Sequence, residues 1–206
     1  MTPMNEPGRP ENPPPLSPRS RRNHWILFTT LAVGLAALDL WSKQAVFALL
    51  GARIEPIPAL PERNHVVADR VIDIIPGFFE LEANINYGAF SGWFSSHTGV
   101  LTVLSLAALA ILGGFFWSHL RRPGPHPSWF TAALGLLWGG TCGNLYDRAT
   151  HGYVRDFIKW FFVWQGKPHV WPNFNIADSA ICVGVGILLV VTVFVGRGKA
   201  PAPIPR

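Results

Sequence analysis

The stretch that decides the fold is TGVLTVLSLAALAILGGFFWSHL, residues 98–120, which contains no Asp, Glu, Lys or Arg. A helix of this length can cross the hydrocarbon core of a bilayer, which is roughly 30 Å thick and needs about 20 apolar residues. A helix at the surface of a soluble bundle would keep a polar face, and this stretch has none. It therefore predicts a membrane-spanning helix.

Three further stretches are similarly apolar, at residues 25–50, 129–146 and 179–196. The first is interrupted by Asp39 and Lys43, and the other two carry no formal charge. Charged residues make up only 14% of the 206 residues, against about 25% in a typical soluble domain. We therefore predict a membrane protein of the all-α class, a bundle of four transmembrane helices. A soluble helical bundle is the less favoured alternative.

The basic residues predict the orientation of the bundle. With four spans, both tails and the loop at 121–128 share one side, which has nine Lys and Arg and two Glu. The other side has the remaining eight basic and ten acidic residues. The positive-inside rule then places both termini in the cytoplasm. We expect a disordered Pro-rich tail at 1–23, a membrane domain at 24–196 and a second tail at 197–206. The basic residues form no stripe with surface aromatics, so nucleic acid is not an expected partner.

The segment at 51–97 is long for a connection between two spans. Apolar and polar residues alternate in FELEANIN, residues 79–86, and this period of two is typical of a strand with one apolar face. We predict a small extracytoplasmic β element between the first two helices, with its apolar face on lipid or on the bundle. Residues 51–75 are assigned no function.

Polar side chains gather at the predicted outer end of the spans. Ionisable groups at membrane depth are costly and usually functional. Asp39 and Lys43 lie four residues apart on one helical face, where they can pair. The others are Asn144, Asp147 and Arg148 at the end of the third span, Asp156 in the short loop after it, and Asn175 and Asp178 at the start of the fourth span. Each also has a structural explanation, as an ion pair, an interfacial anchor or a helix cap.

Asp156 and Asp178 are the pair that could perform chemistry. Two carboxylates close together at low dielectric cannot both ionise easily, so one keeps a proton and the other becomes a base. Such a pair can activate water and protonate a leaving amine, as in an aspartic protease, without a metal or cofactor. Spacing alone slightly favours two unrelated interfacial carboxylates.

Other catalytic and metal-binding patterns are missing from the sequence. The seven His are scattered and form no HExxH, and there is no GxSxG, P-loop or GxGxxG. Both Cys lie in apolar runs, which argues against a disulfide framework or a Cys-based metal site. We therefore expect no metal and no cofactor.

Five sequence blocks make the chain resemble the lipoprotein signal peptidase family, also called signal peptidase II. They are DLWSK (39–43), NYGAFSG (86–92), GGTCGNLYDR (139–148), GYVRDFI (152–158) and FNIAD (174–178). The last three, which lie close together, are the most specific. The second block departs from the family pattern at Phe90 and Ser91.

The resemblance implies a membrane-embedded aspartic endopeptidase of the bacterial inner membrane, with its active site at the outer face. Its substrate is a prolipoprotein, which is cut just before a cysteine that carries diacylglycerol. The resemblance assigns the catalytic dyad to Asp156 and Asp178. Supporting residues at the site are Asp39, Lys43, Asn86, Gly88, Asn144, Asp147, Arg148 and Asn175. The implied partners are the prolipoprotein and membrane lipids, with no obligate protein partner.

Two other functions remain as alternatives. A small transporter or proton-coupled channel could use Asp39, Asp156 and Asp178 as a proton path. It would distribute its charges through the depth of the membrane, whereas this sequence places them at one end. A non-catalytic membrane assembly factor would be favoured only if Asp156 and Asp178 lay far apart.

Overall fold

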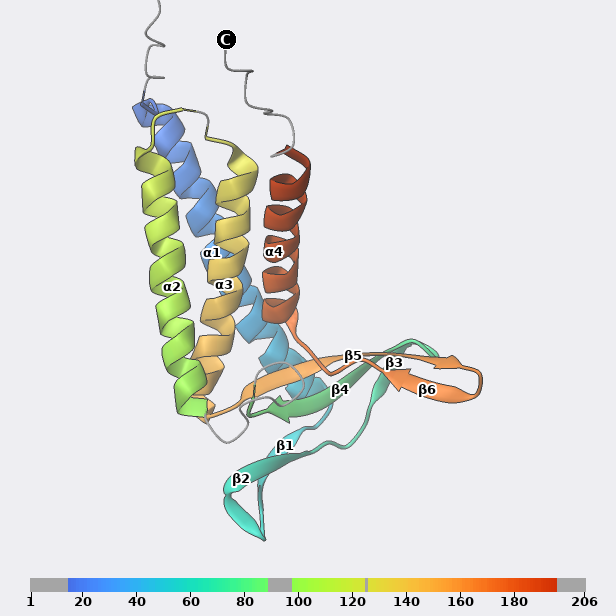
Figure 1. The fold of residues 1–206 in the computed structure, drawn as a ribbon. Coiled ribbons are helices and arrows are strands. Elements are labelled where there is room, and N and C mark those ends of the chain that lie inside the picture. Colours follow the sequence, from blue (N-terminus) through green and yellow to red (C-terminus); the bar gives the residue numbers. More distant parts are fainter. Residues whose placement is uncertain (1–14, 89–97, 125, 196–206) are drawn as a thin grey trace, which may run out of the picture.

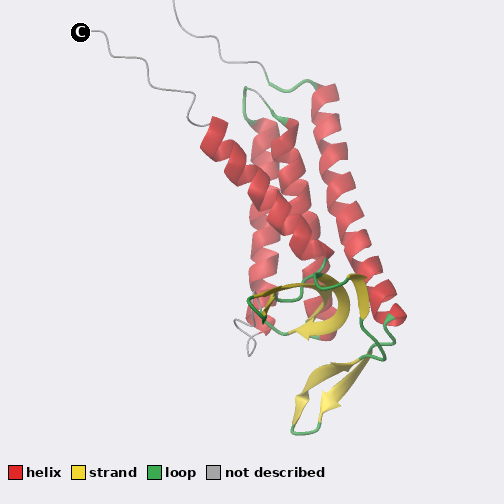
Figure 2. Cartoon of the chain, turned by 90° about the vertical axis from the view of Figure 1, so that its right-hand side faces the viewer, coloured by secondary structure: helices red, strands yellow, loops and turns green. Residues whose placement is uncertain are grey.

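The computed structural model of the protein describes residues 15–88, 98–124 and 126–195. Within them four helices form a bundle, and strands gather at one of its ends (Figure 1) (Figure 2). The helices are α1 (Pro18–Leu49), α2 (Thr98–Arg121), α3 (Ser128–His151) and α4 (Ile176–Val195). The predicted tail at 197–206 and the departures at Phe90 and Ser91 lie outside the described residues.

Three helices in the described part of the chain are long and apolar enough to cross a membrane. They are α1, α2 and residues 176–193 of α4. The remaining helix, α3, is as long as α2, but its glycines and its polar last turns lower its mean hydropathy. It packs against α1, α2 and α4, and ten of its 24 residues are buried. Because its neighbours shield it, α3 needs less apolar surface than they do, and the fourth span stays a prediction.

Glycines on α3 bring its neighbours close. A Cβ atom on Gly139 would lie 2.7 Å from the backbone oxygen of Ala32 in α1, and one on Gly140 would lie 2.5 Å from that of Ala177 in α4. Neither position can therefore hold a larger side chain without moving a helix. This close packing places polar groups of α1 and α4 beside the end of α3.

Helix α1 begins earlier than the sequence predicts. The predicted disordered tail at 1–23 is wrong for residues 18–23, which are helical. The Ser17 side chain accepts a hydrogen bond from the backbone N–H of Ser20 (3.2 Å) and so caps the helix. Pro18 follows at the first helical position, where its missing N–H costs nothing.

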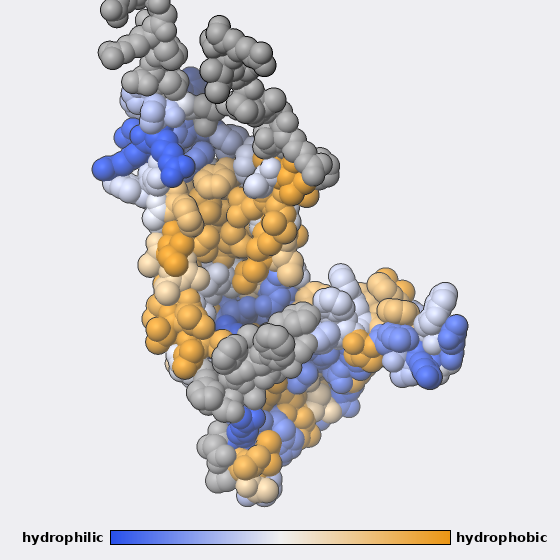
Figure 3. All heavy atoms as spheres, viewed as in Figure 1, coloured by the Kyte–Doolittle hydropathy of each residue, from blue (hydrophilic) through white to orange (hydrophobic). Residues whose placement is uncertain are grey.

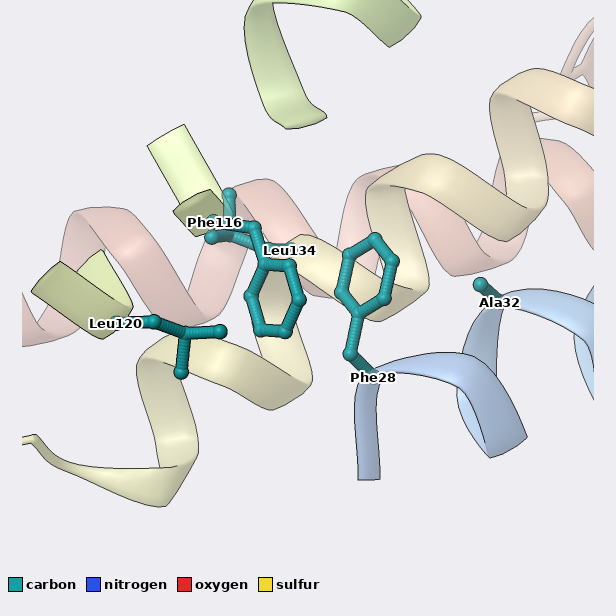
Figure 4. Close-up of a cluster of buried hydrophobic side chains, with 5 residues drawn as sticks. All are labelled: Phe28, Ala32, Phe116, Leu120 and Leu134. Carbon is teal, nitrogen blue, oxygen red and sulfur yellow. The ribbon is translucent and has the colours of Figure 1, made fainter. Parts of the chain in front are cut away.

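The end of the bundle away from the strands is held by apolar packing (Figure 4). The rings of Phe28 in α1 and Phe116 in α2 stack with centroids 4.1 Å apart. Ala32, Leu120 and Leu134 complete the buried cluster, in which Leu134 comes from α3. Three helices therefore share one small core at this end.

The strands form two antiparallel sheets. They are β1 (Arg53–Ile57) paired with β2 (Leu60–Val67), and a four-stranded sheet of β3 (Ile72–Ile75), β4 (Phe79–Asn86), β5 (Val154–Trp164) and β6 (Lys167–Val170) in that order. The sequence predicted β structure only between the first two helices and placed Asp156 in a short loop. That placement is wrong, because residues 154–164 are rich in aromatic and β-branched side chains and pair with the edge of β4.

Candidate active site

Asp156 and Asp178 come from different elements. Asp156 is the third residue of β5, and Asp178 lies in the first turn of α4. The segment before α4 is bonded to β5, because the Phe174 carbonyl accepts the N–H groups of Phe157 (3.0 Å) and Ile158 (2.9 Å). The strand and the helix start are thus held together, and each carries one aspartate.

Two asparagines connect the carboxylates. Asn175 Nδ2 donates to Asp156 Oδ1 (2.7 Å), and Asn144 Nδ2 donates to Asp178 Oδ1 (2.7 Å). Asn175 Nδ2 also donates to Asn144 Oδ1 (3.1 Å). Both aspartates therefore belong to one hydrogen-bond network, in which the two asparagine side chains connect the carboxyl groups.

Asn175 has two roles in this network. Its Oδ1 accepts from the backbone N–H of Asp178 (2.9 Å), while its own N–H donates to Asp178 Oδ2 (3.2 Å). The expected helix cap is therefore present. The same side chain also binds Asp156. The cap at the start of α4 therefore fixes the position of one carboxylate relative to the other.

Lys43 supports the network from α1. Its side chain is fully buried, and its Nζ lies 2.7 Å from Asp39 Oδ2 and 3.2 Å from Asp147 Oδ2, so the predicted Asp39–Lys43 ion pair is present. The same Nζ donates to Asn144 Oδ1 (3.0 Å). Since this oxygen faces Lys43, the Nδ2 of Asn144 is directed at Asp178. The lysine thus orients an amide that touches the candidate dyad.

Asp39 ties this ion pair to α4. Its Oδ1 accepts from the backbone N–H of Ala177 (2.9 Å), one residue before Asp178. Its Oδ2 contacts Lys43, as described above. A buried carboxylate needs such partners, because leaving it unpaired costs several kcal/mol. Asp39 therefore fixes the first turn of α4 against α1.

Arg155 belongs to the site although the sequence reasoning did not single it out. Its guanidinium donates to Asp147 Oδ1 (2.7 Å), and its backbone N–H donates to Asp147 Oδ2 (3.0 Å). Side chains one residue apart on a helix point in different directions, so Asp147 does not pair with its neighbour Arg148. That rule excludes Arg148 as the partner, but only the packing of β5 against α3 brings Arg155 to Asp147, so no local signal in the sequence indicates it.

Arg148 instead faces the open side of the site. Its Nη2 donates to the carbonyl of Gly88 (3.2 Å), and the N–H of Gly88 donates to Asn86 Oδ1 (2.9 Å). Among the described residues, its buried Nε has no hydrogen-bond partner. The guanidinium therefore connects the end of α3 to the residues after β4 and keeps a donor for another group.

A cavity of about 760 Å³ opens beside the two aspartates. Its polar wall includes Asn86, Gly88, Asn144, Arg148, Asp156 and Asp178. Its apolar wall includes Leu101 and Leu104 from α2 and Ile181 and Val183 from α4. Figure 3 shows hydrophilic residues in a recess between the apolar surface of the helices and the strands. The volume lies in the range of about 300–1,000 Å³ that is typical of ligand sites.

The surroundings of Asp156 favour its protonated form. Burial, and then the nearby charge of Asp178, raise the pKa of Asp156 to about 8. A carboxyl group with this pKa can hold a proton at neutral pH and donate it. Among the described residues, no three His, Cys, Asp or Glu side chains are arranged to hold a metal ion.

Comparisons with known proteins agree with the resemblance in the sequence. The family model for signal peptidase (SPase) II matches residues 31–194. A lipoprotein signal peptidase from Rhodopirellula baltica is 37% identical over an alignment of 179 residues that covers 81% of this chain and 71% of that protein. One from Anaeromyxobacter sp. is 33% identical over an alignment of 200 residues that covers 84% of this chain and 88% of that protein.

Two solved structures described as bacterial membrane enzymes share the fold. One has a TM-score of 0.66 and 22% identity, and the match covers 86% of this chain and 94% of that one. The other has a TM-score of 0.60 and 23% identity, with coverage of 81% and 92%. With the family match and the relatives, they lead to one conclusion: the chain belongs to the signal peptidase II family.

Proposed function

We propose that this protein is a membrane-embedded aspartic endopeptidase that removes the signal peptide from diacylglyceryl-modified prolipoproteins. It cuts just before the lipidated cysteine, at the outer face of the bacterial inner membrane. Family membership supports the reaction. The observation that carries the assignment of the site is the hydrogen-bonded chain from Asp156 through Asn175 and Asn144 to Asp178, which borders the cavity.

The balance of charge supports a dyad that shares one proton. Around the cavity and beneath it lie three cations, Lys43, Arg148 and Arg155, and four carboxyl groups, Asp39, Asp147, Asp156 and Asp178. Buried charges are tolerated only when they are compensated. The set is neutral when one of the four carboxyl groups is protonated. Asp156 is that group, because its pKa is raised to about 8.

The reaction then needs only the two aspartates and a water molecule. Asp178 accepts a proton from water, the hydroxyl oxygen adds to the scissile carbonyl carbon, and Asp156 donates its proton to the carbonyl oxygen. When the intermediate collapses, the C–N bond breaks and the leaving amine takes the proton from Asp178. One hydroxyl of the intermediate returns a proton to Asp156, which restores the starting state.

The two walls of the cavity suit a substrate that stays in the bilayer. The polar wall can hold the backbone around the scissile bond, and the Nε of Arg148, which has no partner in the described part of the chain, can donate to a carbonyl there. The apolar wall, from α2 and α4, can face the signal helix and the acyl chains. A substrate whose chains remain in lipid is oriented before it reacts, which lowers the entropic cost.

The proposed orientation has four spans, with α3 as the third, and both termini in the cytoplasm. It is supported by the start of α1 and the end of α4, which lie at the same end of the bundle, opposite the strands (Figure 1). Arg121 ends α2 at that end of the bundle, and Arg122 follows it in the connection to α3. The strands and the candidate dyad then lie at the outer face.

Cleavage by the purified protein tests this function. The protein in detergent should cut a prolipoprotein that carries diacylglycerol on its lipobox cysteine, and mass spectrometry should place the new N-terminus at that cysteine. The matched control is the same precursor without the lipid, which should be cut far more slowly. A folded protein that leaves the lipid-modified precursor intact would refute the proposal.

A further inference from the structure

The β1–β2 hairpin lies outside the candidate site. It extends beyond the four-stranded sheet, on the side away from the helices (Figure 1) (Figure 2). In the part of the chain that the structure describes, the hydrogen-bond network around Asp156 and Asp178 takes no residue from it. Two antiparallel strands alone are only marginally stable in water, so the hairpin depends on the places where it is attached.

The base of the hairpin is attached to the end of α1. The backbone N–H of Asp69, two residues after β2, donates to the carbonyl of Leu50 (3.1 Å). Arg70 Nε donates to the carbonyl of Leu49 (2.9 Å). Asp69 also pairs with Arg53 at the start of β1, with Arg53 Nη2 and Asp69 Oδ1 2.9 Å apart. Because Leu50 is completely buried, this base is fixed relative to the bundle.

Strand β2 is attached to the site by one side chain, that of Tyr87. The backbone N–H of Asn64 donates to Tyr87 Oη (2.6 Å), and this hydroxyl donates to the carbonyl of Asn64 (3.4 Å). Asn64 lies opposite Pro56 of β1, which has no N–H to donate across the hairpin. The guanidinium of Arg63 lies over the ring of Tyr87, 5.2 Å from its centroid. The hydroxyl of Tyr87 therefore bonds both backbone groups of one β2 residue.

Tyr87 lies between two residues of the cavity wall. Asn86 precedes it at the end of β4 and Gly88 follows it, and both line the cavity. The N–H of Gly88 donates to Asn86 Oδ1, and the carbonyl of Gly88 accepts from Arg148. The ring of Tyr87 packs edge to face against the buried Tyr153, just before β5, with centroids 5.7 Å apart. A shift of Tyr87 would therefore move this wall.

We propose that the β1–β2 hairpin is a brace for the cavity, and that Tyr87 is the positioning residue through which it acts. The hairpin reaches from the end of α1 to the hydroxyl of Tyr87 and holds the wall at Asn86 and Gly88 in place. Tyr87 contacts no reacting atom, but it sets where the substrate backbone meets this wall. The effect on cleavage rests on the proposed function, whereas the brace itself is a property of the fold.

Tyr87→Phe tests the contact, because it removes the hydroxyl and keeps the ring. The KM for lipid-modified prolipoprotein should rise about two- to fivefold, since the contact transmits no more than the net strength of a hydrogen bond. The value of kcat should stay nearly constant, as expected when the substrate is held less well and the chemical step is unchanged. An unchanged KM, or a large fall in kcat at constant KM, would overturn the proposal.

Tyr146→Phe is the matched control. It removes the same atom from a tyrosine that is 49% exposed on α3 and does not line the cavity. Neither KM nor kcat should change in this variant. An equal rise in KM in the two variants would show that the loss of any tyrosine hydroxyl is enough, and would overturn the role of the hairpin.

A shortened hairpin tests the other side of the contact. Arg53 and Val67 are paired across the hairpin, so a linker of about four Gly and Ser residues can replace residues 53–67. The shortened protein should show the same rise in KM, and adding Tyr87→Phe to it should have no further effect, because the hydroxyl has then lost its partner. Effects on KM that multiply would overturn the proposal. If the shortened protein does not fold, the comparison of Tyr87→Phe with Tyr146→Phe decides.

Hydrogen–deuterium exchange separates the brace from the proposed reaction. In Tyr87→Phe the backbone amides of residues 79–88 should exchange faster than in the unchanged protein, because the end of β4 opens more often without its brace. Tyr146→Phe should leave this exchange unchanged. Equal exchange in all three proteins would overturn the brace even if the protein cleaves its substrate. Faster exchange in Tyr87→Phe, in a protein that cleaves no prolipoprotein, would support the brace and refute only the peptidase function.

Discussion

The two ends of the helix bundle are held together by different interactions. At the end with the strands, Asp39 and Lys43 are completely buried in a network of ion pairs and amides. At the other end, stacked rings and leucines from α1, α2 and α3 form an apolar cluster beside the rings of His24, His119 and His126. Burying ions costs energy, whereas close apolar packing stabilises helices in a membrane. The first end is therefore suited to catalysis, and the packing at the second end stabilises the bundle.

This contrast also separates the candidate functions. A proton path would need ionisable groups along the depth of the bundle, from one membrane surface to the other. Instead Asp39, Asp156 and Asp178 lie together at one end, and the apolar cluster around Phe28 and Leu134 separates them from the histidines near the other end, His24, His119 and His126. Substitutions at each end test whether the two ends differ in this way. The largest loss of activity is expected at the candidate dyad.

Asp156→Asn and Asp178→Asn should each lower the rate of cleavage by about 10⁴-fold or more, because one carboxyl group is missing from the proton transfers. Each change keeps nearly the same volume and can keep its hydrogen bond to Asn175 or Asn144 in a rotated amide. The helix content and the melting temperature in detergent should therefore stay near those of the unchanged protein. Cleavage of lipid-modified prolipoprotein and circular dichroism, measured on the same preparations, check both statements.

Arg155→Met should destabilise the protein by about 3–5 kcal/mol, because it leaves the buried Asp147 with a cation missing. Combining it with Asp147→Asn should restore part of the lost stability, because the carboxylate charge and its cationic partner are then removed together. Thermal unfolding of the two single variants and the double variant in one detergent measures this coupling. Strictly additive losses would show that Arg155 and Asp147 do not act as a pair.

Leu134→Ala, at the apolar end, should cost about 2–5 kcal/mol of stability, because Leu134 is 1% exposed and its removal leaves a cavity. The rate of cleavage per folded molecule should stay within a small factor of normal. Val190→Ala is a control on an exposed helix face away from the cavity, where a smaller loss is expected. A fall in turnover as large as that of a dyad variant would contradict the division between the two ends.

The smallest expected effect is that of pH. Because the pKa of Asp156 is raised to about 8, its proton is present below that pH and lost above it. The value of kcat/KM should therefore fall by about tenfold per pH unit above about pH 8. The measurement needs a parallel check that the protein stays folded over the same range. A flat profile from about pH 7 to 10 would contradict the assignment of Asp156 as the acid.

The sequence predicts the helices of this fold better than its strands. The uncharged stretch at 98–120 corresponds to α2, Thr98–Arg121, because the apolar composition of one continuous stretch is enough to predict a membrane helix. The pairing of β5 with β4, about seventy residues earlier in the chain, cannot be read from local sequence, although the aromatic and β-branched residues of β5 themselves favour a strand. The start of α1 depends on one cap, Ser17, within a Pro-rich segment that otherwise disfavours a helix.

The candidate site shows the same division. Asp39 and Lys43 could be paired from their helical spacing alone. The partners of Asp147 could not be predicted in this way, because Lys43 comes from α1 and Arg155 from β5, and only the packed fold brings them to it. The link through Asn144 and Asn175 likewise depends on the approach of α3 to α4 at Gly140.

The central claim is that Asp156 and Asp178 act as one unit, and a double-mutant cycle on cleavage of lipid-modified prolipoprotein tests it most directly. If the two carboxyl groups share the proton transfers, the double variant Asp156→Asn/Asp178→Asn should be scarcely slower than either single variant. All three proteins must be shown to be folded in the same detergent. Near-normal cleavage by either folded single variant, or losses that simply multiply in the double variant, would contradict the claim.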